Sequence, residues 1–123
     1  MPVEFNGQRQ LVQLTQKTLA GVSARDGAIL WRNDWPGRTA VIPTPIVHRD
    51  GIYISSGYGV GCRRITIGAG HDVSEDYSNK NMKNHHGGVL LLDGHLYGYS
   101  DGRGWTCQNL KSCLLYTSDA ADE

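Results

Sequence analysis

The segments PVEFNG at residues 2–7, PIVHRDG at residues 45–51 and GVLLLDG at residues 88–94 share one pattern. Each is a short apolar run that closes in a turn ending in glycine. The final glycines are separated by 44 residues, from Gly7 to Gly51, and by 43 residues, from Gly51 to Gly94. A repeat of about 40–50 residues built from short strands is typical of proteins assembled from similar small sheets. The spacing therefore predicts one β-rich unit that occurs three times.

Alternating apolar and polar residues, as in QLVQLT at 10–15, predict half-buried strands within each unit. The first unit is expected to hold strands at residues 2–5, 10–15, 19–24 and 28–31. The second is expected to hold strands at 45–48, 52–55 and 62–67, and the third at 89–92, 95–99 and 105–110. Residues 75–86 are polar, and Ser74 stands 43 residues after Trp31, so this stretch is interpreted as a long loop or an irregular outer strand.

No stretch has helical periodicity, and turn signals recur every 8–12 residues or so, which favours an all-β fold. A β-sandwich would fit the strand content but not the fixed period. The prediction is therefore a fragment of a β-propeller with about three four-stranded blades. Blade 1 covers residues 1–35, blade 2 with a long polar connection covers 36–86, and a truncated blade 3 without its outer strand covers 87–112. Three blades cannot close a ring, so an arc of a larger ring is expected.

The last eleven residues, 113–123 (CLLYTSDAADE), resemble the translation of a sequencing-library transposon adapter. They begin where the third unit should continue with a turn glycine and a strand ending in tryptophan. They are therefore interpreted as a non-native tail and set aside from the fold prediction. The other interpretation is a natural short acidic tail. Resequencing the source locus beyond Ser112 distinguishes the two.

The segment ARDGAILW at residues 24–31 resembles the motif that closes each blade of quinoprotein-like propellers, the PQQ-like repeat family. Gly27 matches the turn glycine of the motif, and Trp31 matches the tryptophan that docks against the neighbouring blade. Asp26 stands in place of the usual threonine. The segment NLKS at 109–112 resembles the first half of the same motif. Trp105 is likewise interpreted as a blade-packing residue. Kelch propellers are a more distant alternative family.

The resemblance implies two functions that the sequence leaves open. One is a non-catalytic scaffold that binds a protein or a small molecule at a propeller face. The other is part of an alcohol dehydrogenase that uses pyrroloquinoline quinone (PQQ) and calcium. The enzymes of this class often need a pair of adjacent cysteines and a cluster of oxygen ligands, but Cys62 and Cys107 are 45 residues apart and no acidic cluster stands out. The scaffold is therefore favoured, and the resemblance implies a periplasmic or exported protein.

Three residues are candidates for contact with a ligand. His85 and His86 precede Gly87-Gly88, and one imidazole could face a central channel, although neighbouring residues in a strand point to opposite sides. Arg103, in a glycine-rich turn, could bind an acidic ligand. The alternative for all three is a solvated loop. Catalytic, metal-binding and cofactor-binding residues are not identified.

The bulk composition excludes several classes of protein. The 123 residues carry 12 Lys and Arg against 12 Asp and Glu, so nothing indicates a nucleic-acid partner. No run of about 18 apolar residues predicts a transmembrane helix. The first residues, MPVEF, lack the basic start and apolar stretch of a secretory signal.

Overall fold

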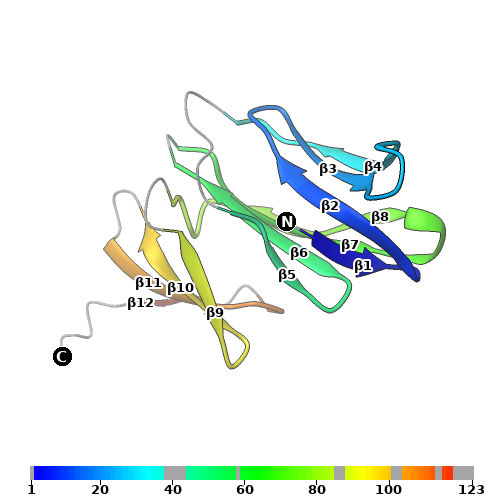
Figure 1. Ribbon diagram of the computed structural model, residues 1–123. Helices are drawn as coiled ribbons and strands as arrows, with labels where there is room; N and C mark the ends of the chain where they lie inside the picture. The colour runs from blue at the N-terminus through cyan, green and yellow to red at the C-terminus, as the bar shows by residue number, and fades with distance from the viewer. Residues whose placement is uncertain are drawn as a thin grey trace.

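The computed structural model of the chain describes residues 2–37, 44–57, 59–84, 88–100 and 104–112, together with the backbone of residues 115–117. Within these residues the fold is all-β, as predicted: the strands form three four-stranded sheets. In each sheet, strands that follow one another in the chain are paired antiparallel. Figure 1 shows the three sheets, with the second lying between the other two. In the described residues these sheets do not form a closed ring.

Sheet 1 contains β1 (Pro2–Phe5), β2 (Gln8–Leu14), β3 (Thr18–Ser23) and β4 (Ile29–Asp34). The turn between β1 and β2 is Asn6-Gly7, whose φ angles are 53° and 73°. Two consecutive positive φ angles are those of the type I′ turn, which suits the right-handed twist of paired strands. The Asn-Gly pair in the sequence therefore accounts for the first hairpin.

Sheet 2 contains β5 (Ile46–His48), β6 (Gly51–Ser56), β7 (Gly61–Ile67) and β8 (Val73–Asn79). Of the two interpretations of the polar stretch after Ser74, the outer strand is correct as far as Asn79. The turn between β5 and β6 is Arg49-Asp50, so Gly51 opens the next strand instead of ending the turn. A Cβ atom at Gly51 would lie 2.4 Å from Arg64 Nη2, so the glycine makes room for a side chain of β7.

Sheet 3 contains β9 (Val89–Leu92), β10 (His95–Ser100), β11 (Gly104–Asn109) and β12 (Leu115–Thr117). The third unit was expected to lack its outer strand. This expectation is wrong, because the backbone of β12 pairs with β11 as a fourth strand. Strand pairing uses main-chain N–H and C=O groups that every residue other than proline has, so an open edge accepts an extended segment of almost any sequence. The adapter origin of residues 113–123 stays a prediction.

The strands recur at an almost constant interval. The third strands of the sheets begin at Thr18, Gly61 and Gly104, which are 43 residues apart in both steps. The register of β3 against β4 shifts between Gly21 and Val22, and that of β7 against β8 shifts 43 residues later, between Arg64 and Ile65. Each shift leaves one extra residue on the outer strand, which is the geometry of a β-bulge.

The bulge corrects one alignment made from the sequence. Trp31 lies opposite Gly21, and the residue opposite Arg64 is Tyr77. Tyr77, and not Ser74, therefore takes the place of Trp31 in sheet 2. The reason is that the β7–β8 hairpin is three residues longer than the β3–β4 hairpin, counted from the paired residues beside each bulge.

Sheet 2 is covered on both faces. Its side chains Ile52, Ile54, Ile65 and Ile67 belong to the core shared with sheet 1, whereas Tyr53 and Cys62 belong to the core shared with sheet 3. All six residues of β6 are buried for this reason. A strand with both faces covered reads as an unbroken apolar run, and GIYI at the start of β6 has this form.

Candidate functional site

The ligand candidates expected from the sequence, His85, His86 and Arg103, lie outside the described residues. Of the expected packing residues, Trp31 is 5% exposed and lies in the core between sheets 1 and 2. Gly27 lies in the exposed β3–β4 turn at φ 79°, with open space where a side chain would be. Gly27 therefore serves the turn and has no packing role.

Trp105 is 68% exposed, so in this chain it does not pack between two sheets as expected. It lies on the face of sheet 3 that points away from sheet 2. Its ring meets that of Tyr99 edge to face, with the ring centroids 5.6 Å apart. The motif predicted an aromatic strand position correctly but not which surface would cover it.

A chain of polar groups that begins in the core joins sheet 1 to the β7–β8 connection of sheet 2. The indole Nε1 of Trp31 donates to Gln10 Oε1 at 2.6 Å. Gln10 Nε2 lies 3.3 Å from Nε2 of His71, which belongs to η1 (Ala69–His71) between β7 and β8. The turn of Asn6 is tied to the same segment, because Asn6 Nδ2 donates to the Gly68 carbonyl at 2.9 Å. These contacts fix the end of sheet 2 against sheet 1.

Arg63 of β7 joins sheets 1 and 2 at a second place, near the end of β4. Its guanidinium lies 5.1 Å from the centre of the Trp35 ring, which is a cation–π contact. Nη1 of Arg63 donates to Asn33 Oδ1 at 2.7 Å and to the Asp34 carbonyl. Glu75 forms an ion pair with Nε of the same guanidinium at 3.3 Å. One arginine of sheet 2 therefore satisfies polar groups at the end of β4.

The contact between sheets 2 and 3 is also hydrogen-bonded within the core. The phenol of Tyr53 donates to Gln108 Oε1 at 3.1 Å, and both residues are almost fully buried. Ser55 Oγ donates to the Met82 carbonyl and accepts from the Asn84 backbone N–H. The polar residues inside the stack therefore hold adjacent sheets together.

Asn84 has the one buried side-chain atom without a hydrogen-bond partner among the described residues, namely its Oδ1. Its Nδ2 donates to the Tyr99 carbonyl at 2.9 Å, so the amide is held in place. A buried carbonyl oxygen in this position can accept one hydrogen bond, for which a water molecule is sufficient.

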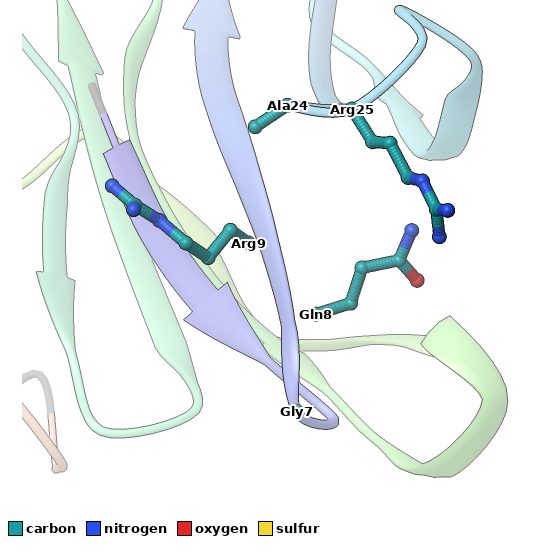
Figure 2. A pocket seen from close by; sticks show the side chains of 5 residues that line it. All are labelled: Gly7, Gln8, Arg9, Ala24 and Arg25. Atoms are coloured by element: carbon teal, nitrogen blue, oxygen red, sulfur yellow. The ribbon is translucent and has the colours of Figure 1, made fainter.

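An open depression of about 620 Å³ lies at the end of sheet 1, between the β1–β2 and β3–β4 turns. Figure 2 shows the Gln8 and Arg25 side chains extending toward each other across it, whereas Arg9 extends to the other side of β2. Gly7 and Ala24 complete its lining. A guanidinium and an amide together suit a carboxylate or phosphate group. This depression is therefore a candidate place for a small anionic ligand.

The outer face of sheet 3 carries most of the exposed large apolar side chains in the described part of the chain. Its exposed members are Leu90, Leu92, Tyr97, Tyr99 and Trp105. A hydrogen bond between the Tyr97 and Cys107 side chains raises the pKa of the Tyr97 phenol. An exposed patch of this kind marks a site of interaction with another molecule.

Residues 2–37, 44–57, 59–84, 88–100 and 104–112 bring together no group of three His, Cys, Asp or Glu side chains able to hold a metal ion. Cys62 and Cys107 are 45 residues apart in the sequence and form no disulfide with each other. No helix in the described part of the chain is long and apolar enough to cross a membrane.

Two residues of the inter-sheet contacts were missed from the sequence although a signal was present. Gln10 occupies the inward position of an alternating strand, where Val12 and Leu14 are also buried. Arg63 occupies an inward position in the same way, beside Ile65 and Ile67 in β7. A polar residue at an inward position predicts a buried hydrogen bond. Burial removes its hydrogen bonds to water, and a partner within the protein must replace them.

A scan against models of known protein families finds no match to this chain. A search of curated proteins likewise finds no similar sequence.

Proposed function

We propose that the three sheets are successive blades of a quinoprotein-like β-propeller and that they act as a binding scaffold without catalytic chemistry of their own. The observation that carries the proposal is the middle sheet, which is a four-stranded meander buried on both faces by two similar meanders. Propeller blades are four-stranded sheets of this kind, and they pack face to face around an axis. The 43-residue interval between the strands and between the two bulges supports the same assignment.

The scaffold role is supported by what the buried polar side chains do. Gln10, Tyr53, Arg63 and Gln108 all take part in contacts between sheets. Their hydrogen bonds join one sheet to the next, so they stabilise the stack. The ligand of such a scaffold is a protein or a small molecule bound at a blade end, where the turns of sheet 1 form the depression beside Arg25. The resemblance to periplasmic propellers supports a location in the periplasm or outside the cell as part of this proposal.

Binding of PQQ tests the proposal against the dehydrogenase alternative. The intact protein is titrated with PQQ with and without calcium, and heat release and tryptophan fluorescence are followed. The scaffold predicts no calcium-dependent binding at micromolar PQQ. Saturable binding that is lost when calcium is chelated would overturn the scaffold and establish the quinoprotein enzyme.

The anion-binding part of the proposal has its own measurement. A panel of small carboxylates and inorganic phosphate is titrated against the protein while the amide signals of Gln8 and Arg25 are followed by NMR. Binding should shift these signals, and Arg25→Gln should abolish the shifts. Arg49→Gln, in the β5–β6 turn, is the matched control and should leave them unchanged. If both variants reduce the shifts equally, general charge attraction explains the effect and the depression is not a site.

A further inference from the structure

The outer face of sheet 3 carries an ordered set of apolar side chains. Leu90, Tyr97 and Cys107 lie side by side across β9, β10 and β11, and Tyr99 lies beside Trp105. Leu90 is 73% exposed and Trp105 is 68% exposed. Apolar side chains exposed to this extent on adjacent strands are hydrated at a cost in free energy. Another surface packed on them would remove this cost.

The same register positions in sheet 2 are covered. There, Ile46, Tyr53 and Arg64 lie side by side across β5, β6 and β7, and Ser55 lies beside Cys62. Tyr53 and Cys62 are each 1% exposed, because sheet 3 packs on this face. The outer face of sheet 3 is therefore built like a face that is buried inside the stack.

The outer face of sheet 1, at the other end of the stack, also exposes apolar side chains. Pro2, Leu11, Val22 and Ile29 form a row across its four strands, and this row crosses the β-bulge at Val22. Leu11 is 46% exposed and Ile29 is 61% exposed. An apolar row that spans a whole sheet is therefore left facing solvent.

The matching row of sheet 2 is Val47, Ile52, Ile65 and Glu75, and it crosses the bulge at the same place. Ile52 and Ile65 are both fully buried, because sheet 1 packs on them. Sheet 1 therefore presents outward the kind of face that sheet 2 presents to its neighbour.

From these matches we propose that two copies of this chain associate head to tail, with the outer face of sheet 3 in one copy packed on the outer face of sheet 1 in the other. Faces of these two kinds already meet twice inside the chain, between sheets 1 and 2 and between sheets 2 and 3. The new contact continues the same series across two molecules. It rests on sheet packing alone and does not depend on the proposed function.

A cation on the outer face of sheet 1 and aromatic rings on the outer face of sheet 3 also suit the packing of a second copy. Arg32 lies beside Ala20 on the outer face of sheet 1, two residues along β3 from Val22. In sheet 2 the same row holds Arg63 on β7, at the place of Ala20, and its guanidinium covers the ring of Trp35 at the end of β4. The exposed Tyr99 and Trp105 rings of a second copy offer Arg32 the same kind of partner.

Sedimentation velocity of the full chain over a range of concentrations tests the proposal. The weight-average mass should rise with concentration. Trp105→Glu removes the sheet 3 face, and Leu11→Glu removes the sheet 1 face, so each variant alone should associate at least tenfold more weakly. A head-to-tail contact is made of two different surfaces. An equimolar mixture of the two variants should therefore form a 1:1 dimer and nothing larger.

Ser74→Glu, which adds a charge at an exposed position of β8 in sheet 2, is the matched control and should associate like the original chain. Trp105→Thr and Leu11→Thr remove the apolar area but keep a residue that favours strands, and near-UV circular dichroism checks that every variant folds. A chain that stays monomeric at all concentrations contradicts the proposal. So does association that Trp105→Glu abolishes but Leu11→Glu leaves intact, because two sheet 3 faces would then be in contact with each other.

Discussion

The Trp31 indole determines the orientation of two other side chains in the core. An indole N–H can only donate, so the oxygen of the Gln10 amide must face Trp31. The amide nitrogen of Gln10 then faces His71, and the Nε2 atom of that imidazole must accept the hydrogen bond. His71 makes this contact from the left-handed region, at φ 62°, which is uncommon for a residue with a side chain. A single donor-only group thus orders the polar contacts between sheets 1 and 2.

Replacing Gln10 by alanine should destabilise the chain by about 1–3 kcal/mol, because the buried indole N–H of Trp31 loses its acceptor. Urea unfolding followed by tryptophan fluorescence measures the change. Gln13→Ala is the matched control: Gln13 lies on the same strand with an exposed side chain, and its loss should change the free energy of unfolding by less than about 0.5 kcal/mol. Equal losses for the two variants would show that the buried hydrogen bond contributes nothing particular.

The phenol of Tyr97 should titrate above the usual tyrosine pKa of 10.0, because its hydrogen bond with Cys107 favours the neutral form. A folded-state pKa that is raised contributes stability below the unfolded pKa of 10.0, and this contribution is lost as the pH rises through the folded value. The difference in absorbance at about 295 nm between the chain and Tyr97→Phe follows this one group. Cys107→Ala should lower the transition, and a transition that does not move would refute the role of the thiol.

At the scale of the strand, the sequence predicted where the elements lie but not how they bulge. The predicted and observed limits of β1 (Pro2–Phe5) and β9 (Val89–Leu92) agree, because alternation and turn residues are local signals. The bulges beside Gly21 and Arg64 depend on how two strands are paired, and this pairing leaves no local mark in either strand. For the same reason the tryptophan position of sheet 2 was assigned to the wrong residue.

Gly21 is required by the packing of the Trp31 and Gln10 side chains against β3. A Cβ atom there would lie 2.1 Å from Nε1 of Trp31 and 2.5 Å from Oε1 of Gln10, and both are held in the core. Gly21→Ala should therefore destabilise the chain by about 1–3 kcal/mol through overpacking. Thermal unfolding by circular dichroism measures the loss.

Gly68→Ala is the matched control for this substitution. At Gly68 the nearest atom to an added Cβ is the Asp72 carbonyl oxygen at 3.6 Å, which is an ordinary contact. The φ angle of −91° at Gly68 also suits alanine. Its unfolding temperature should stay the same or rise slightly, since alanine reduces the freedom of the unfolded chain. If Gly21→Ala is tolerated as well as Gly68→Ala, the packing of Trp31 and Gln10 against β3 does not require a glycine.

At the scale of the molecule, the sequence predicted separate sheets in series but not the residues that join them. The series follows from the 43-residue period. Contacts such as Arg63 with Trp35 join residues that the sequence places in different units, so no local pattern identifies them as partners. The surface at Trp105 could not be predicted either, because its exposure depends on what covers the last sheet.

The two cores meet only through sheet 2 in the described part of the chain, so damage to different sheets should spread differently. Ile65→Ala, in the core shared with sheet 1, should cost about 2–5 kcal/mol and reduce amide hydrogen-exchange protection in both sheets. Leu96→Ala, in the core shared with sheet 3, should cost a similar amount but leave the amides of sheet 1 better protected than those of sheet 3. This contrast is expected of units that contact only their neighbours, in which stability is transmitted from one sheet to the next. Native-state hydrogen exchange by mass spectrometry measures protection for each sheet. If Leu96→Ala lowers protection in all three sheets to the same extent, the chain unfolds as one cooperative unit. Sheet 2 would then couple the stability of sheet 1 to that of sheet 3 more tightly than nearest-neighbour packing requires.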